Sequence, residues 1–461
     1  RRGDIKRVNG KGEIMTFETK GKENNGAIYG RRSDWQDLYS IAKKYYEALL
    51  ADPGNAQFHL TDPRGASDKS GRTFNNPYQY FFEQMHMDDA IYADESIYEY
   101  PMQQGGGNDG RPYSFGRPSS GGSKAAYPCK SYGQGRINPA YFYGVFDPND
   151  MRRDVSITMT GSNGKGVEKL IPFVPNSKAE GGGLTLNKWD ENRQANPWVA
   201  AQRKSGINGP YMRMSEVYLG YAEVCASLGD VVTGKQYLKT VRERSFPQGL
   251  ANTDAFIASF GNDLVRAIIE ERGFEYAGEG DRRWTLIRSG YLPEDIKRIK
   301  DMTKAMMDGL ATKGYYEFEN GNIISAYIWT KLVDAKTIYG HRLTAQCPTD
   351  KVNDPVLYPG WRGQKDNWEE MGLNYGSSTP ATNLAIKGLF EIVSEEEAAS
   401  LESQGYAKVN WGIDLVDYRD EYDKYLFWDY DYVSAPIYLW PFTPNVMAAG
   451  GFTNGYGFKQ E

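Results

Sequence analysis

The stretch that decides the fold is RMSEVYLGYAE, residues 213–223. Its apolar side chains recur three and four residues apart, a spacing that places them on one face of an α-helix. We expect this helix over about 211–228. Gly229 is suited to end it, because glycine adopts the left-handed conformation of a helix C-terminus without strain. A second amphipathic stretch follows over about 234–244, and the two predict an αα-hairpin of the tetratricopeptide (TPR) kind.

Further helices are expected on both sides of this hairpin. Two follow it, at about 263–276 and 281–289, and the latter ends at Gly290. One precedes it at 33–52, where Ser33 and Gln36 form a capping box and the turn sequence DPGN at 52–55 ends the helix. Weaker helical patterns lie at about 293–310 and 393–403, and 79–99 is helical or mixed.

Other stretches depart from the helical pattern. Residues 155–160 and 167–174 flank a Gly-Ser-Asn-Gly segment and alternate in hydrophobicity, which predicts a β-hairpin attached to the helical body. Residues 103–140 form a long glycine-rich loop, and 311–380 and 404–461 are expected to be mostly loops that carry tryptophans. We therefore predict a mainly α protein, an α/α superhelix of TPR-like helical hairpins with long loops and small β-hairpins.

Composition excludes several classes of partner and site. The chain has 54 Lys+Arg against 60 Asp+Glu, a net charge of −6, and lacks the basic stripe that would bind phosphate backbones, so nucleic acid is excluded. No apolar run approaches the roughly 18 residues that span a bilayer. The three cysteines and three histidines lie far apart, so we predict no metal, no cofactor and no disulfide framework, and Cys225 is expected in the core.

Aromatic residues are unusually abundant in this polar chain. They make up 14% of the sequence, with 34 Tyr, 19 Phe and 10 Trp, whereas the mean hydropathy is −0.65. Such a combination indicates rings on exposed loops as well as in the core. Large amphipathic rings at a surface are typical of recognition sites.

Three segments resemble the SusD/RagB family of nutrient-capture lipoproteins. The helix at 213–223 is similar to the family's Arg-x-Ala-Glu-Val-Tyr-Leu-x-Tyr-Ala-Glu helix, with Ser215 in place of Ala. The segment ERGFEYAGEGDRRWTLIRSG, residues 271–290, resembles the signature Glu-Arg…Glu…Glu-Gly-x-Arg-x-Trp-Asp-Leu-x-Arg-x-Gly, with Thr285 in place of Asp. The tail LWPFTPN, residues 439–445, is a weaker match to the family's closing Pro-Ile-Pro segment.

The resemblance implies an organisation and a function. It implies one SusD-like domain over 1–461 that lacks its N-terminal portion, with 33–52 as an upstream TPR-like helix, 103–200 as ligand-binding loops, 210–290 as the helical core and 291–461 as a loop-rich C-terminal region. It also implies an outer-membrane, cell-surface lipoprotein without catalytic activity. Such a protein captures oligosaccharides and delivers them to a SusC-like TonB-dependent β-barrel transporter. The lipid anchor that would attach it to the membrane is expected to be missing from this chain.

Sugars present flat C–H faces and a rim of hydroxyls, so a binder needs aromatic rings and planar hydrogen-bonding groups. In the family, part of the glycan site lies in loops that correspond here to 103–145. We predict Tyr113, Phe115 and Tyr132 as platforms, with Asn108, Asp109 and Arg111 as polar partners. Trp361 and Trp368 are further candidates. The same stretch carries Arg117, Tyr127, Asn138, Tyr141 and Tyr143, and any single ring could instead attach its loop to the body.

Three alternatives stay open: a peptide-binding RagB-like protein, a glycoside hydrolase with two facing carboxylates, and a TPR scaffold for protein partners. For Glu271, Glu275 and Glu279 we expect pairing with arginines rather than catalysis, because charged side chains are rarely buried without a partner.

Overall fold

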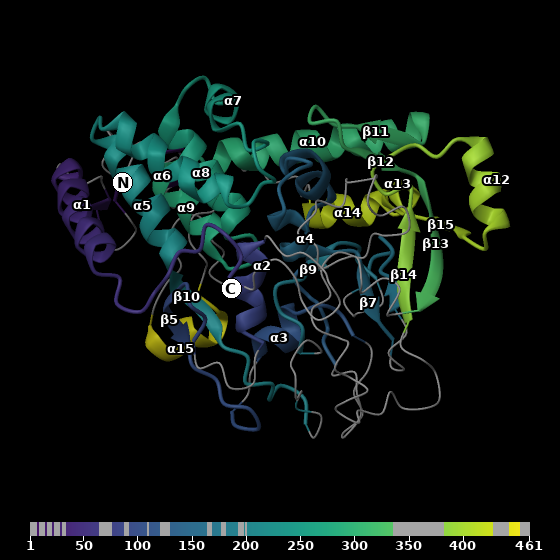
Figure 1. Ribbon diagram of the computed structural model, residues 1–461, viewed down its shortest axis with the longest axis horizontal. Helices are drawn as coiled ribbons and strands as arrows, with labels where there is room; N and C mark the ends of the chain where they lie inside the picture. The colour runs from purple at the N-terminus through teal and green to yellow at the C-terminus, as the bar shows by residue number, and fades with distance from the viewer. Residues whose placement is uncertain are drawn as a thin grey trace.

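The computed structural model describes residues 34–63, 76–86, 92–107, 110–119, 130–163, 168–176, 181–191, 198, 201–334, 382–426 and 442–451, with four two-residue strands between residues 7 and 29. Figure 1 shows helices α1 and α5–α9 gathered in one half, and a small sheet with α12, α13 and α14 at the other end. The helical half contains α1 (Trp35–Ala51), α5 (Met214–Ser227), α6 (Val231–Glu243), α7 (Thr253–Ala258), α8 (Leu264–Glu275) and α9 (Asp281–Ser289). The mainly helical prediction is confirmed.

The α5–α6 hairpin forms where the sequence predicts it. Gly229 follows α5 with a φ of 92°, and Asp230 begins α6 by accepting a hydrogen bond from the Thr233 backbone N–H. Helix α1 packs against α5 at a position that requires glycine, because a Cβ at Gly220 would lie 2.3 Å from the Tyr46 hydroxyl. The predicted N-terminal boundary of α5 is wrong by three residues, because the segment before Met214 is a strand.

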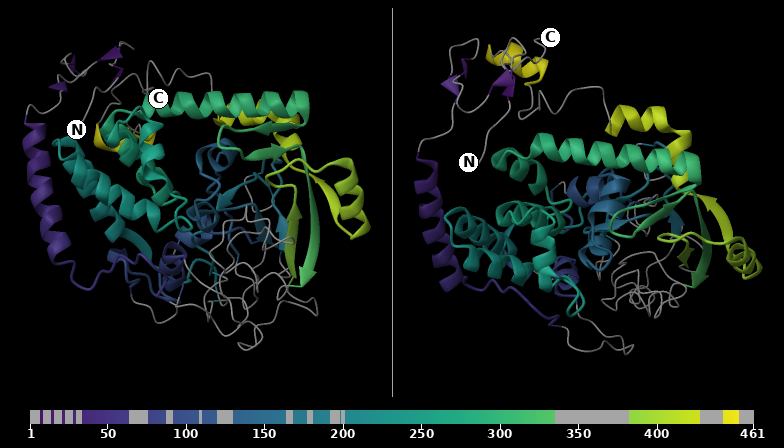
Figure 2. Two further views of the ribbon diagram at one scale, coloured as in Figure 1. Left: turned by 45° about the horizontal axis from the view of Figure 1, so that its top comes forward. Right: turned by 90° about the horizontal axis from the view of Figure 1, so that it is seen from above.

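Helix α10 (Leu292–Lys313) connects the helical half to the sheet. It packs against α9 near one end, and against β11 (Tyr315–Glu317) and α13 (Gly412–Asp417) farther along. Figure 2 shows it crossing the molecule from the helices to the sheet. The largest apolar core lies beneath it and includes Phe142, Phe146, Ile157, Met306 and Trp411.

In the described residues 311–334 and 404–426, the sheet beyond α10 corrects the prediction that these stretches are mostly loop. Its central strand β13 (Tyr327–Asp334) pairs antiparallel with β14 (Thr382–Lys387) and with β15 (Ala407–Asn410). Trp329 and Trp411 are buried, and the Trp411 Nε1–H donates to the Tyr143 hydroxyl at 2.8 Å. The pattern was missed because β14 lies far from β13 in the sequence. Helices α12 (Glu395–Ser403) and α14 (Arg419–Leu426) and strand β12 (Ile323–Ser325) complete this end.

The predicted β-hairpin exists but is displaced. Strand β7 (Thr160–Ser162) pairs with β8 (Glu168–Leu170), whereas residues 152–156 form the short helix α4 (Arg152–Ser156). All side chains from Arg152 to Thr160 are buried. The alternation of apolar and polar residues in this stretch therefore does not correspond to an alternation of buried and exposed side chains. The segment is therefore part of the core rather than an attachment to it. The remaining elements are α2 (Pro77–Gln84), β5 (Ser96–Tyr100), α3 (Gly110–Phe115), a π-helix (Tyr141–Val145), β6 (Ile157–Thr158), β9 (Thr185–Leu186), β10 (Gly209–Arg213) and α15 (Pro444–Gly450), with β1 (Arg7–Val8), β2 (Ile14–Met15), β3 (Gly21–Lys22) and β4 (Ile28–Tyr29) at the start.

Ten ionised side chains form one buried network in the helical half. Glu275 of α8 lies at its centre, where it accepts from Arg213 at 2.5 Å, from Arg244 at 2.7 Å and from Arg152 at 3.0 Å. The network contains five cations and five carboxylates, none more than 7% exposed: Arg152, Lys188, Arg213, Arg242 and Arg244 with Glu95, Asp150, Glu271, Glu275 and Glu279. The expected structural pairing of Glu271, Glu275 and Glu279 is confirmed.

Acid is expected to destabilise the fold through these carboxyls. Burial alone would raise the pKa of Glu275, but Arg244, Arg213 and Arg152 outweigh it and hold that pKa well below its ordinary range. Arginines likewise lower the pKa of Glu95 and of Glu223. A lowered pKa means that the unfolded chain takes up protons that the folded chain does not. The stabilisation is therefore complete above about pH 4.3 and is lost as the pH falls further. We expect the Tm to be level down to about pH 5 and to drop steeply below about pH 4 in thermal scans; a Tm unchanged at about pH 3 would contradict this.

Candidate functional site

The predicted binding loop is only partly within the described residues. Asn108, Asp109, Trp361 and Trp368 lie outside them, so their roles stay predictions, and Tyr127 is outside them too. Arg111, Tyr113, Phe115 and Tyr132 are described, and their roles in binding also stay predictions. Of the other residues of this stretch, Tyr143 is fully buried and the Tyr141 hydroxyl donates to the Gly273 carbonyl.

Helix α3 and the segment 130–136 hold the described part of this loop together. The Tyr132 backbone N–H donates to the Tyr113 carbonyl at 2.8 Å, and Ser119 and Ser131 form an antiparallel bridge. These bonds bring the rings of Tyr113 and Tyr132 into edge-to-face contact, with centroids 5.0 Å apart. Beneath them Arg117 is buried and paired with Glu168, so this arginine supports the loop from inside.

The three predicted aromatic platforms differ in exposure. Phe115 is 47% exposed, Tyr132 is half-buried and Tyr113 is only 4% exposed. The Arg203 guanidinium lies over the Tyr113 ring at 4.4 Å. Burial, and next a hydrogen bond with Tyr132, raise the pKa of Tyr113. The buried Tyr113 ring therefore packs against Tyr132 and Arg203, whereas Phe115 presents more ring surface to solvent.

Arg111 connects this loop to a second, unpredicted surface. A Cβ added to Gly209 would lie 1.9 Å from the Arg111 Nη1, so a larger residue here would displace the guanidinium. Gly209 pairs with Tyr100 in the two-stranded sheet of β5 and β10. The predicted polar partner Arg111 therefore lies against the strand that carries the next aromatic group.

Three exposed tyrosines form a compact group on β5 and β10, which we call the tyrosine cluster: Tyr98, Tyr100 and Tyr211. They are 51%, 51% and 70% exposed. The Tyr211 centroid lies 5.6 Å from that of Tyr98 and 5.7 Å from that of Tyr100, with the rings near perpendicular. Sequence reasoning missed all three. The alternation of Tyr98 and Tyr100 was a usable signal, but Tyr211 was assigned to a helix.

Two features of the backbone direct the rings of the tyrosine cluster toward solvent. Along β5 the side chains alternate, and Glu99 between the two tyrosines is buried, where it accepts hydrogen bonds from the Ala93 N–H and the Asn208 Nδ2. On β10 the register shifts between Pro210 and Met212, so Tyr211 is an extra residue opposite β5. Such β-bulges re-aim a side chain and are frequent beside functional sites. The result is one solvent-facing group of rings.

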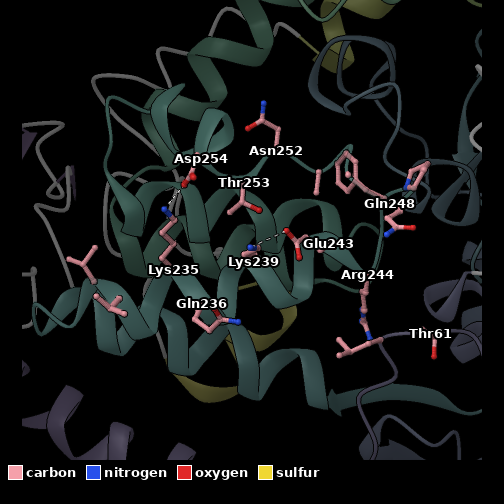
Figure 3. A pocket seen from close by; sticks show the side chains of 17 residues that line it. Thr61, Lys235, Gln236, Lys239, Glu243, Arg244, Gln248, Asn252, Thr253 and Asp254 are labelled. Atoms are coloured by element: carbon pink, nitrogen blue, oxygen red, sulfur yellow. Dashed lines mark ion pairs between the residues drawn. The ribbon is translucent and has the colours of Figure 1, made fainter.

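Two pockets lie elsewhere, and none of the predicted site residues lines them. One, of about 940 Å³, lies against the outer face of α6, where Lys235 pairs with Asp254 and Lys239 with Glu243 (Figure 3). Exposed Val232 and Leu250 are among its apolar lining. The other, of about 1160 Å³, lies between α7, α8, α10 and the segment 144–150.

Within the described ranges, the acidic groups offer no metal site. No cluster of three or more His, Cys, Asp or Glu side chains in them could hold a metal ion. Likewise, none of the helices described combines the length and apolar character that a membrane crossing needs.

A family-wide sequence model described as the SusD family matches residues 57–441. The chain belongs to the SusD family. The resemblance read from residues 213–290 is thereby confirmed. Proteins of the SusD family are binding proteins without catalytic activity, so the glycoside hydrolase alternative is set aside.

Individual relatives are distant. The chain is 28% identical over 160 residues to the SusD-like protein P25 of Formosa agariphila, a match that covers 34% of this chain and 26% of that relative. A SusD homolog from Bacteroides thetaiotaomicron aligns with a TM-score of 0.39 and 18% identity, over 59% of this chain and 56% of that one. Surface glycan-binding protein A from the same species, solved with laminarihexaose, aligns with a TM-score of 0.38 and 18% identity. That alignment covers 57% of this chain and 52% of the other. The SusD-family chain described here thus spans little more than half of these structures.

Proposed function

We propose that this SusD-family protein binds oligosaccharides at the bacterial cell surface. The observation that carries the proposal is the tyrosine cluster, three exposed rings that β5 and the bulged β10 hold side by side. Monomeric proteins rarely expose rings as a group unless the group binds something. Family membership supports a binding role without catalysis.

The chemistry of the cluster fits a sugar better than a flat apolar ligand. Each ring offers an apolar face for the C–H face of a pyranose, and each hydroxyl can exchange hydrogen bonds with the sugar's rim. Arg111, at the edge of the cluster, adds a planar donor group. The predicted loop residues Phe115 and Tyr132, with Asn108, Asp109, Trp361 and Trp368, are proposed to extend the same binding surface.

Calorimetric titration of the purified chain against a panel of soluble polysaccharides and a pool of peptides tests this proposal. Saturable binding to at least one glycan, without release of reducing ends, is the expected outcome. Binding to peptides alone would support the RagB-like alternative instead. Binding to neither would refute ligand capture by this chain.

We further propose that the protein is held by a lipid at the outer face of the outer membrane and passes its ligand to a SusC-like TonB-dependent barrel. The outer face of α6 is proposed as the contact, because exposed Val232 and Leu250 there border a groove rimmed by paired charges. Val232 is 82% exposed, so its replacement leaves the fold intact.

Val232→Asp is expected to weaken the complex with the co-expressed barrel about tenfold, because a charge in the middle of an apolar contact must be desolvated. Co-purification at graded salt measures this, with glycan affinity unchanged in the same variant. A complex of unaltered strength would place the contact elsewhere.

A further inference from the structure

Two cationic side chains lie over the rings of Tyr113 and Tyr132 in the predicted binding loop. The Arg203 guanidinium lies 4.4 Å from the centroid of Tyr113, and the Lys130 Nζ lies 5.1 Å from that of Tyr132. The two rings touch each other edge to face. Cation–π contacts of this kind fix where a charge sits. We call Lys130 and Arg203 the cationic pair.

Neither member of the cationic pair is neutralised by a carboxylate among the described residues, since no carboxylate oxygen there lies within 4.0 Å of either. This contrasts with the buried arginines below, each of which pairs with an acidic side chain, as Arg117 does with Glu168. In a chain of net charge −6, a local excess of cations is a distinct feature.

The backbone at Arg203 is strained. Its φ is +62°, in the left-handed region that glycine occupies freely and arginine rarely adopts. Glycine would relieve the strain but would also remove the guanidinium from the Tyr113 ring. Strain that persists at a charged, exposed residue points to a function of its side chain.

We propose that the cationic pair binds an anionic substituent of the captured saccharide, either the carboxylate of a uronic acid or a sulfate ester. This rests on the proposed glycan-binding function and names its ligand class. An anionic group that contacts either cation supplies a counter-charge in a charge-assisted hydrogen bond. A neutral saccharide leaves both cations without a counter-charge.

Helix α3 connects the cationic pair to the tyrosine cluster. Tyr113 and Arg111 both lie on α3, and Arg111 abuts Gly209, the partner of Tyr100. A saccharide long enough to reach from the tyrosine cluster past α3 would present a substituent to Lys130 and Arg203. The tyrosine rings would then bind any sugar with an apolar face, and the cationic pair would favour saccharides that carry an anionic group.

The test compares ligands that differ in charge alone. A galacturonate oligomer is titrated beside its methyl ester, and a sulfated galactan oligomer beside its desulfated form. At least one anionic form is expected to bind about tenfold more tightly than its neutral partner. That preference should shrink as NaCl rises from about 50 to about 500 mM. The two arms distinguish a carboxylate from a sulfate.

Variants assign the preference to the cationic pair. Arg203→Gln and Lys130→Met should each lower affinity for the preferred anion about fivefold and leave the neutral form unchanged. Lys408→Met is the matched control, because Lys408 also stands over an exposed ring, that of Tyr327 at 4.3 Å, but on the distant sheet. Arg203→Gly should show the same loss while raising the Tm by about 1–2 °C, since it relieves the strained backbone.

Several outcomes overturn the proposal. If glycans bind but the anionic and neutral forms bind equally, the ligand class is wrong and glycan capture stands. The same conclusion follows if Arg203→Gln and Lys130→Met behave like Lys408→Met. If no saccharide of either charge binds, the glycan-binding function fails and this inference fails with it.

Discussion

Replacing Tyr98, Tyr100 and Tyr211 together with alanine is expected to reduce affinity for the bound glycan by about 100-fold or more. Truncating a single well-packed ring at a binding surface costs about 1.4 kcal/mol, which is tenfold in affinity. The rings touch one another, so removal of one also releases its neighbours. Calorimetry on the single variants and the triple variant measures each loss. Tyr211, the most exposed ring, should contribute the most.

The fold offers a control for this experiment. Tyr45 of α1 is 71% exposed and lies on another element than the three rings of the tyrosine cluster. Tyr45→Ala should therefore leave affinity unchanged. All of these variants should unfold near the wild-type temperature, since exposed side chains contribute little to stability. A triple variant that binds within about threefold of wild type would remove the tyrosine cluster from the binding surface.

Glu275→Gln is expected to be the most destabilising conservative change in the helical half, by about 3–5 kcal/mol. The carboxylate is fully buried and accepts from three arginines. The amide keeps the volume but removes the charge, so five buried cations then face four carboxylates. An uncompensated buried charge is costly because the surroundings cannot replace water. Denaturant titration with a constant m-value measures the loss.

Two further variants show whether charge balance is the cause. Asp301→Asn breaks an exposed ion pair with Lys297 on α10 and should change the free energy of unfolding by less than about 0.5 kcal/mol. Adding Arg244→Met to Glu275→Gln restores equal numbers of charges and should recover part of the stability. A loss below about 1 kcal/mol for Glu275→Gln alone would show that the network relaxes around the missing charge.

Sequence reasoning predicted the helical half because its signals are local. The spacing of apolar residues in 213–223 and the glycine at 229 each act within a few residues of the element that they define. Helix formation depends on these short separations, so one chain suffices to find it.

The sheet and the tyrosine cluster could not be predicted in the same way. Strand β13 pairs with β14 across a long intervening segment of sequence, and no local sequence pattern identifies β14 as its partner. Tyr211 looked helical because apolar residues follow it at helical spacing, whereas pairing with β5 makes it a bulge. In the loop, sequence alone could not separate buried Tyr113 from exposed Phe115, since both are aromatic residues of one short helix.

The buried network has a kinetic consequence for ligands that arrive from solution. Its five positive and five negative groups cancel, so the net charge of −6 resides on the other groups of the chain. An anionic saccharide then approaches through a repulsive field and meets attraction only close to Lys130 and Arg203. Added salt should therefore speed its arrival while also hastening its departure, since both forces are screened.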